Sequence, residues 1–151
     1  MKEILTIDQG TTSSRSIIFN ESLEIVQESQ KEYDLSFPKD GWVEVDADDI
    51  LNSVKETLNN VFMSSKSLSN IISCGITNQR ESTVIWDKST GKAIYPVIIW
   101  QDRRTSELCN SLRQDNTITK MVSEKTGLLV DPYFSATKIK WILDNVKGAR
   151  I

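Results

Sequence analysis

The sequence contains no histidine and only two cysteines among its 151 residues. A relay that passes a proton from serine to histidine is therefore excluded, and so is a metal site built on imidazole. Cys74 lies in an apolar stretch and Cys109 in a predicted helix, and their spacing is not that of a metal site. We expect two free thiols without a chemical role, as is usual for a reducing cytosol.

The sequence also lacks an excess of basic residues and any long apolar run. Lysine and arginine number 18 against 21 acidic residues, whereas nucleic-acid and anionic-membrane surfaces are usually basic. No apolar run is long enough to cross a membrane, and Met1-Lys2-Glu3 leads into a strand without the layout of a signal peptide. With 38% hydrophobic and 26% charged residues, the composition predicts a soluble globular domain that forms one core.

What the sequence does contain is a polar loop between two short apolar runs, Ile4–Ile7 and 16–19, which together predict a β-hairpin. Gly10 would let the backbone approach a ligand closely. Hydroxyl groups and a guanidinium group suited to phosphate oxygens follow it, on Thr11, Thr12, Ser13, Ser14 and Arg15. Asp8, at the end of the first strand, is placed to hold a hydrated Mg²⁺ that bridges those phosphates.

The loop alone leaves two interpretations open, a phosphate cradle and a polar turn with an exposed aspartate and arginine. It is not a P-loop, because it has no Gly-Lys-Ser/Thr sequence and no helix pattern follows it.

The rest of the chain predicts an α/β layer fold with a mixed sheet. Asp46 and Asp48 begin a helix whose inward residues are predicted to be Ile50, Leu51, Val54, Leu58, Val61 and Phe62. Residues 71–77 form a nearly continuous apolar run, typical of a strand buried on both faces. Further strands are expected over 24–31, 82–87 and 93–100, and further helices over 105–113, 118–125 and 135–146.

A second polar cluster, 78–81, follows the strand predicted over 71–77. Arg80 can donate and Glu81 can accept hydrogen bonds, so together they can hold two adjacent hydroxyls of a small polyol. The alternative is a surface ion pair. Trp100 could form an apolar wall for the polyol carbons, or it could be a core tryptophan.

Several of these segments resemble one family. Asp8-Gln-Gly-Thr-Thr-Ser-Ser-Arg15 is similar to the first phosphate loop of the FGGY carbohydrate kinases. Thr77-Asn-Gln-Arg-Glu81 and Asp131-Pro-Tyr-Phe-Ser135 are similar to the glycerol kinases within that family. With 41–44, 100–105 and 137–144, the resemblance covers essentially the whole chain.

The resemblance implies the ribonuclease-H-like fold of actin, Hsp70 and the sugar kinases, in which two such domains surround a cleft. Residues 1–151 would form part of the N-terminal domain of a cytoplasmic enzyme, with the C-terminal domain outside this chain. The implied activity is ATP- and Mg²⁺-dependent phosphorylation of glycerol to sn-glycerol 3-phosphate, by an enzyme expected to be a homo-oligomer. The family's catalytic base and adenosine pocket lie beyond residue 151, so the chain alone is expected to be inactive.

Specific roles follow from the same resemblance. The nucleotide phosphates would contact Thr11, Thr12, Ser13 and Arg15, and the polyol would contact Arg80, Glu81 and Tyr133. Asp102 and Arg103 match a segment of the broader superfamily, but the residues themselves favour an ion pair that holds a helix start, and that is the role we expect. A kinase for another polyol or a ketose is disfavoured by Thr77–Glu81, and a non-catalytic actin-like interaction module is disfavoured because Arg80 and Glu81 are retained.

Overall fold

The computed structural model describes residues 2–65 and 68–150, and the chain divides into two compact units. The sheet unit comprises the chain up to Leu35 together with Asp46–Gln79. The helical unit comprises Ser36–Val45 and the chain from Arg80 onward. The prediction of one core stays a prediction, because each unit is described by itself. Periodicity shows which residues face inward, but it does not show which inward faces meet.

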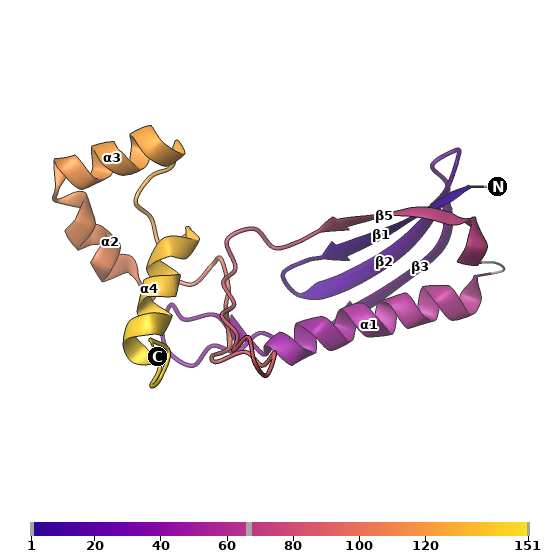
Figure 1. Cartoon of the computed structure of the whole chain (residues 1–151), viewed down its shortest axis with the longest axis horizontal. Coiled ribbons are helices and arrows are strands. Elements are labelled where there is room, and N and C mark those ends of the chain that lie inside the picture. The colour runs from indigo at the N-terminus through magenta and orange to yellow at the C-terminus, as the bar shows by residue number, and fades with distance from the viewer. Residues whose placement is uncertain (1, 66–67, 151) are drawn as a thin grey trace. The chain divides into compact units, whose positions relative to one another are not determined.

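A mixed four-stranded sheet forms the first unit, in the order β3-β2-β1-β5 (Figure 1). β1 and β2 form the predicted antiparallel hairpin, β3 pairs antiparallel with β2, and β5 pairs parallel with β1. The mixed α/β architecture is thus confirmed. The elements of the unit are β1 (Glu3–Gln9), β2 (Ser13–Asn20), β3 (Ile25–Glu32), α1 (Ala47–Ser64), the 3₁₀ turn η1 (Leu68–Asn70) and β5 (Ile71–Thr77).

Helix α1 runs along the sheet and packs on β2 and β3 (Figure 1). Asp46 caps its first turn by accepting from the Asp48 N–H at 2.8 Å, as the sequence predicted. Its buried residues are Val61, which packs with Leu5 and Ile18, and two that periodicity missed, Ser53 and Thr57. Their hydroxyls bond Ser14 and Ser16 of β2 at 2.8 and 2.9 Å.

The inward face of the helix differs from the sequence prediction, whereas its end agrees with it. Leu51 was expected to face inward but is 49% exposed, because the inward face is shifted toward the two hydroxyl residues, whose hydrogen bonds make their burial tolerable. The predicted end of the helix lies at Ser64–Ser67. The helix ends at Ser64, and residues 66–67 lie outside the described residues.

The prediction that residues 71–77 are buried on both faces is wrong. β5 is an edge strand that pairs with β1, and Ile72 and Ile76 are 61% and 74% exposed. Cys74 of the same strand is also exposed. The reason is that α1, the helix of this unit, packs chiefly on β2 and β3 and leaves β5 largely exposed.

An apolar edge strand of this kind favours association between copies of the chain, because it offers both unpaired backbone groups and apolar side chains. We expect the 151-residue chain to self-associate reversibly, and the double variant Ile72→Lys/Ile76→Lys to remain monomeric. Sedimentation velocity over a range of concentrations measures this. Met63→Lys, on an 88% exposed residue of α1, is the control that should associate like the unmutated chain. Equal association of all three proteins would show that the copies do not associate through Ile72 and Ile76 of β5.

The helical unit contains β4 (Glu44–Val45), β6 (Val97–Ile98), α2 (Ser106–Arg113), α3 (Asn116–Thr126) and α4 (Ser135–Asn145). The three helices are close to the predicted ranges, and Gly127 ends α3 in the left-handed conformation, with φ 71°. The strands predicted over 82–87 and 93–100 are wrong in extent. They reduce to β6 and the isolated bridges Thr83–Ile98 and Trp86–Ala93, because β4 offers β6 a partner only two residues long.

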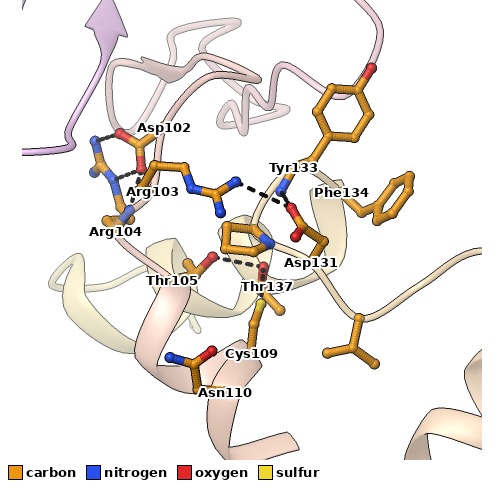
Figure 2. A network of polar contacts seen from close by, with 12 residues as sticks. Asp102, Arg103, Arg104, Thr105, Cys109, Asn110, Asp131, Tyr133, Phe134 and Thr137 are labelled. Carbon is orange, nitrogen blue, oxygen red and sulfur yellow. Dashed lines mark hydrogen bonds and ion pairs between the residues drawn. The ribbon is translucent and has the colours of Figure 1, made fainter. Parts of the chain in front are cut away.

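Arg104 organises the interior of the helical unit. Its guanidinium is fully buried, 2.8 Å from the Asp102 carboxylate and 2.7 Å from the Glu44 carboxylate, and it stacks 3.9 Å above the Trp42 ring. The expected pairing of Asp102 with Arg103 is therefore wrong. Figure 2 shows Arg104 bonded to Asp102 while Arg103 points toward Asp131, which it contacts at 3.3 Å. Adjacent arginines in this turn point in different directions, which sequence alone does not reveal.

Candidate active site

The candidate phosphate loop is the tight turn of the β1–β2 hairpin. Asp8 and Arg15 face each other across the two strands, and Gln9 faces Ser14, so the turn itself consists of residues 10–12. The Gly10 N–H donates to the Ser13 carbonyl at 2.9 Å. A Cβ atom on Gly10 would lie 3.1 Å from that oxygen, so the turn is tight enough to favour glycine.

Tyr33, which follows β3, holds this turn in place through hydrogen bonds. Its hydroxyl donates to the Gly10 carbonyl and accepts from the side-chain amides of Gln9 and Gln79 at 2.7 and 3.1 Å. Its backbone N–H donates to the Thr12 carbonyl at 3.0 Å. Burial raises the pKa of Tyr33 to about 12, against the opposing effect of the Gln9 hydrogen bond, so the phenol stays a donor. Sequence reasoning missed Tyr33, because no motif marks it, and it missed the role of Gln79 within the 77–81 motif.

The predicted phosphate-binding residues are divided between the turn and β2. Thr11 and Thr12 lie in the turn, whereas Ser13 and Arg15 lie on β2. Both β2 side chains contact Gln30 of β3, which donates to the Ser13 hydroxyl at 3.2 Å and accepts from the Arg15 Nε at 3.1 Å. Arg15 is exposed and its described side-chain partner is a neutral amide, so its charge is available to an anion.

Ser14 must be removed from the set of loop donors. Its side chain is fully buried and bonds the Ser53 hydroxyl of α1, which places it on the opposite side of β2 from Arg15. Successive residues of a strand point to opposite faces, so a run of hydroxyl residues cannot all face one ligand.

Asp8 is exposed at the carboxyl end of β1, and its carboxylate accepts no hydrogen bond from any described residue. Within residues 2–65 and 68–150, no group of three or more acidic or cysteine side chains could hold a metal ion. A single carboxylate fits Mg²⁺, which commonly keeps several waters and takes its remaining ligands from substrate phosphates.

The candidate polyol residues lie in the helical unit, around the first turn of α4. Glu81 Oε2 accepts from the Ser135 backbone N–H and from the Ser135 hydroxyl, both at 2.9 Å. Phe134, at the N-cap position of α4, gives no side-chain cap, so the Glu81 carboxylate takes that function. Oε1 has no hydrogen-bond partner within the described part of the chain. Arg80 is exposed, and among the described residues it forms no ion pair with Glu81. The structure therefore does not contain the surface ion pair that was the alternative interpretation.

Trp100 and Tyr133 complete this cluster. Their ring centroids are 5.9 Å apart in an edge-to-face arrangement, and both rings are only partly buried. The Tyr133 N–H donates to the Asp131 carboxylate at 2.9 Å, and Figure 2 shows the ring extending away from that carboxylate. Trp100 is therefore not a fully buried core tryptophan, and its partly exposed ring could contact a ligand. The polyol cluster is hereafter Arg80, Glu81, Trp100 and Tyr133.

Comparison with known proteins decides the family. A profile of the FGGY family of carbohydrate kinases, N-terminal domain, matches residues 3–150. The chain belongs to this family.

Individual relatives of this FGGY chain are glycerol kinases. The glycerol kinase of Alteromonas mediterranea is 55% identical over 150 residues, covering 99% of this chain and 30% of the relative. That of Streptococcus pyogenes is 57% identical, covering 99% of this chain and 29% of the relative. The chain therefore spans about 30% of the length of these proteins.

Solved structures agree on the fold of this FGGY chain. The crystal structure of Plasmodium falciparum glycerol kinase with ADP has a TM-score of 0.89 at 34% identity, covering 99% of this chain and 30% of that one. The gluconate kinase of Lactobacillus acidophilus has a TM-score of 0.87 at 20% identity, covering 98% and 29%, which shows the fold alone. The predicted sugar-kinase fold is confirmed. Among the described residues, no helix combines the length and apolar character that crossing a membrane requires.

Proposed function

We propose that this chain is the N-terminal part of an ATP-dependent glycerol kinase, which transfers the γ-phosphoryl group of ATP to glycerol and forms sn-glycerol 3-phosphate. The observation that carries the proposal is the polyol cluster. Glu81 is fixed through Oε2 while Oε1 stays uncommitted, and the Trp100 and Tyr133 rings lie together in the same unit. A carboxylate acceptor, an arginine donor and an apolar ring are the groups that a three-carbon polyol needs.

The hairpin turn and the start of β2 would hold the nucleotide phosphates through Thr11, Thr12, Ser13 and Arg15. Tyr33 supports this assignment, because its hydrogen bonds occupy the carbonyls of Gly10 and Thr12, whose partial negative charge would otherwise oppose an anion. Asp8 would hold Mg²⁺ through water, and the ion supplies positive charge that neutralises the β- and γ-phosphate oxygens.

The reaction forms a bond between a glycerol oxygen and the γ-phosphorus and breaks the bond from that phosphorus to the ADP oxygen. The hydroxyl proton must go to a base. We assign the base and the adenosine pocket to the remaining part of the enzyme, as the sequence resemblance implies. The complete enzyme is proposed to be cytoplasmic and homo-oligomeric.

A chimeric enzyme tests the proposal. Residues 1–150 of this chain replace the matching 150 residues of Alteromonas mediterranea glycerol kinase, which are 55% identical. The purified chimera is expected to form glycerol 3-phosphate from Mg-ATP and glycerol, with intact Alteromonas enzyme as the assay control. A folded chimera that is inactive, or that prefers xylulose or gluconate to glycerol, contradicts the proposal.

Arg80→Ala in the chimera is expected to raise the KM for glycerol by roughly 10- to 100-fold, the loss expected for one charge-assisted hydrogen bond. The KM for ATP should barely change, because Arg80 would bind the polyol in both the ground and transition states. Arg150→Ala removes an exposed arginine of the same unit that contacts Asp144 and serves as control. Equal rises in both KM values would show that Arg80 does not bind the polyol specifically.

Arg15→Ala and Thr11→Val should act on the nucleotide instead. For Arg15, the loss of one charge-assisted phosphate contact corresponds to roughly a tenfold to hundredfold fall in kcat/KM for ATP. Lys31→Ala removes a cation on the neighbouring strand β3 that pairs with Glu56, and it is the control. An effect confined to glycerol affinity would show that the hairpin turn is not the phosphate site.

A further inference from the structure

Lys138 is a fully buried lysine that the proposed function leaves unexplained. It lies in the first turn of α4. Its ammonium donates to three backbone carbonyls, those of Tyr133, of Pro132 at 3.0 Å and of Phe134 at 3.3 Å. No carboxylate in the described part of the chain lies within ion-pair distance of its Nζ. Three successive carbonyls therefore converge on one cation.

This is an unfavourable place for a lysine if stability were its only purpose. Burial of an ammonium is costly, and the positive end of the helix dipole repels a cation in the first turn. Burial lowers the pKa of Lys138 to about 8, against the opposing effects of Glu81, Asp102, Cys109 and Asp131. An apolar residue of similar length would avoid this cost but would remove the donor from the three carbonyls, so the contribution of the ammonium lies in the backbone that it holds.

What it holds is the backbone of the polyol cluster. The carbonyls belong to the segment that carries the Tyr133 ring and leads into Ser135. Ser135 in turn donates its N–H and its hydroxyl to Glu81 Oε2. One turn of α4 thus fixes two of the four members of the polyol cluster.

Glu81 needs such support, because its backbone has φ 67°, which is uncommon for a residue other than glycine. A residue in this conformation persists only where its surroundings determine it. The Ser135 hydroxyl also lies 3.3 Å from the Glu81 backbone carbonyl, which is an alternative acceptor for its single proton.

We propose that Lys138 and Ser135 are positioning residues of the glycerol site. Lys138 fixes the backbone that carries Tyr133, and Ser135 fixes the Glu81 carboxylate so that Oε1 faces the polyol. Neither side chain touches the polyol itself. The inference rests on the proposed function.

The chimera provides the test, with Lys138→Met and Ser135→Ala as the variants. Each is expected to raise the KM for glycerol by about tenfold, the loss expected for one or two hydrogen bonds that hold the site, with an unchanged KM for ATP. Ser135→Thr keeps the hydroxyl and is expected to restore the KM for glycerol. The matched controls are Lys140→Met, an exposed lysine of α4 that pairs with Asp144, and Ser106→Ala, the first residue of α2. Both controls should leave both KM values unchanged.

The outcomes separate this inference from the proposed function. An inactive unmutated chimera contradicts the proposed function, and it also contradicts the positioning role, which rests on that function. If the unmutated chimera is active, an unchanged glycerol KM in both variants, or equal rises for glycerol and ATP, overturns the positioning role alone. If Lys138→Met does not fold, the comparison of Ser135→Ala with Ser135→Thr tests the positioning role. Ser135→Ala removes only one hydroxyl and leaves the hydrogen bond from the backbone N–H to Glu81.

Discussion

Replacement of Arg104 by methionine is expected to lower the free energy of unfolding of the helical unit by about 3–5 kcal/mol. The guanidinium is fully buried between the carboxylates of Asp102 and Glu44, whose side chains are 0% and 9% exposed. Methionine would leave two negative groups close together without a cation, and neither could be solvated in place. The contact with the Trp42 ring, 3.9 Å from the guanidinium, would also be lost.

Tryptophan fluorescence reports the unfolding of the helical unit, because all four tryptophans of the chain lie in that unit. Urea titrations of the 151-residue chain followed at this signal give the free energy of unfolding of that unit. Arg103→Met is the matched control. Its side chain is 54% exposed and pairs with Asp131, and such surface pairs contribute about 0–1 kcal/mol. Similar losses in the two variants would show that burial of Arg104 does not govern its effect.

The second large effect concerns turnover by the chain alone. We expect the 151-residue chain to form no detectable glycerol 3-phosphate under conditions in which the chimera is active. Phosphoryl transfer depends on positioning and on electrostatic stabilisation of a charge-dispersed transition state. The proposed phosphate loop and polyol cluster would supply contacts to each substrate, but no described residue is a good candidate for the base. Closure around both substrates also requires a second wall.

The assay compares the purified chain, its Asp8→Ala variant and the chimera with Mg-ATP and glycerol at matched concentrations. The chain should give the same background as Asp8→Ala. Turnover by the chain above that variant would mean that the base lies within residues 1–151 and has been misplaced.

The sequence predicted the hairpin, the cap of α1 and the end of α3 because each depends on neighbours within a few residues. An apolar run that stops at Asp8 and resumes after Arg15 can be read without knowing the fold. The same holds for Asp46 as a cap and for Gly127 as a left-handed stop. The resemblance carried by residues 8–15 and 77–81 identified the family for the same reason, since it depends on residues contiguous in the sequence.

Sequence failed where a residue's environment depends on distant segments. The apolar pattern of β5 matches a buried strand, yet whether a helix covers it depends on where α1 packs. Ser53 and Thr57 look like exposed helix residues, and they are buried only because Ser14 and Ser16 of β2 meet their hydroxyls.

The sequence by itself determined the family, the hairpin, the helices and the residue types of the two candidate sites. The tertiary structure decided which side chains are held, and by what. Tyr33 is bonded to a loop more than twenty residues earlier, and Ser135 to Glu81, which lies 54 positions away. Lys138 would be expected on a helix surface, but it lies beneath the polyol cluster because three carbonyls converge there. The physical reason is that hydrogen bonds and burial depend on distances in space, which periodicity and motif spacing do not specify.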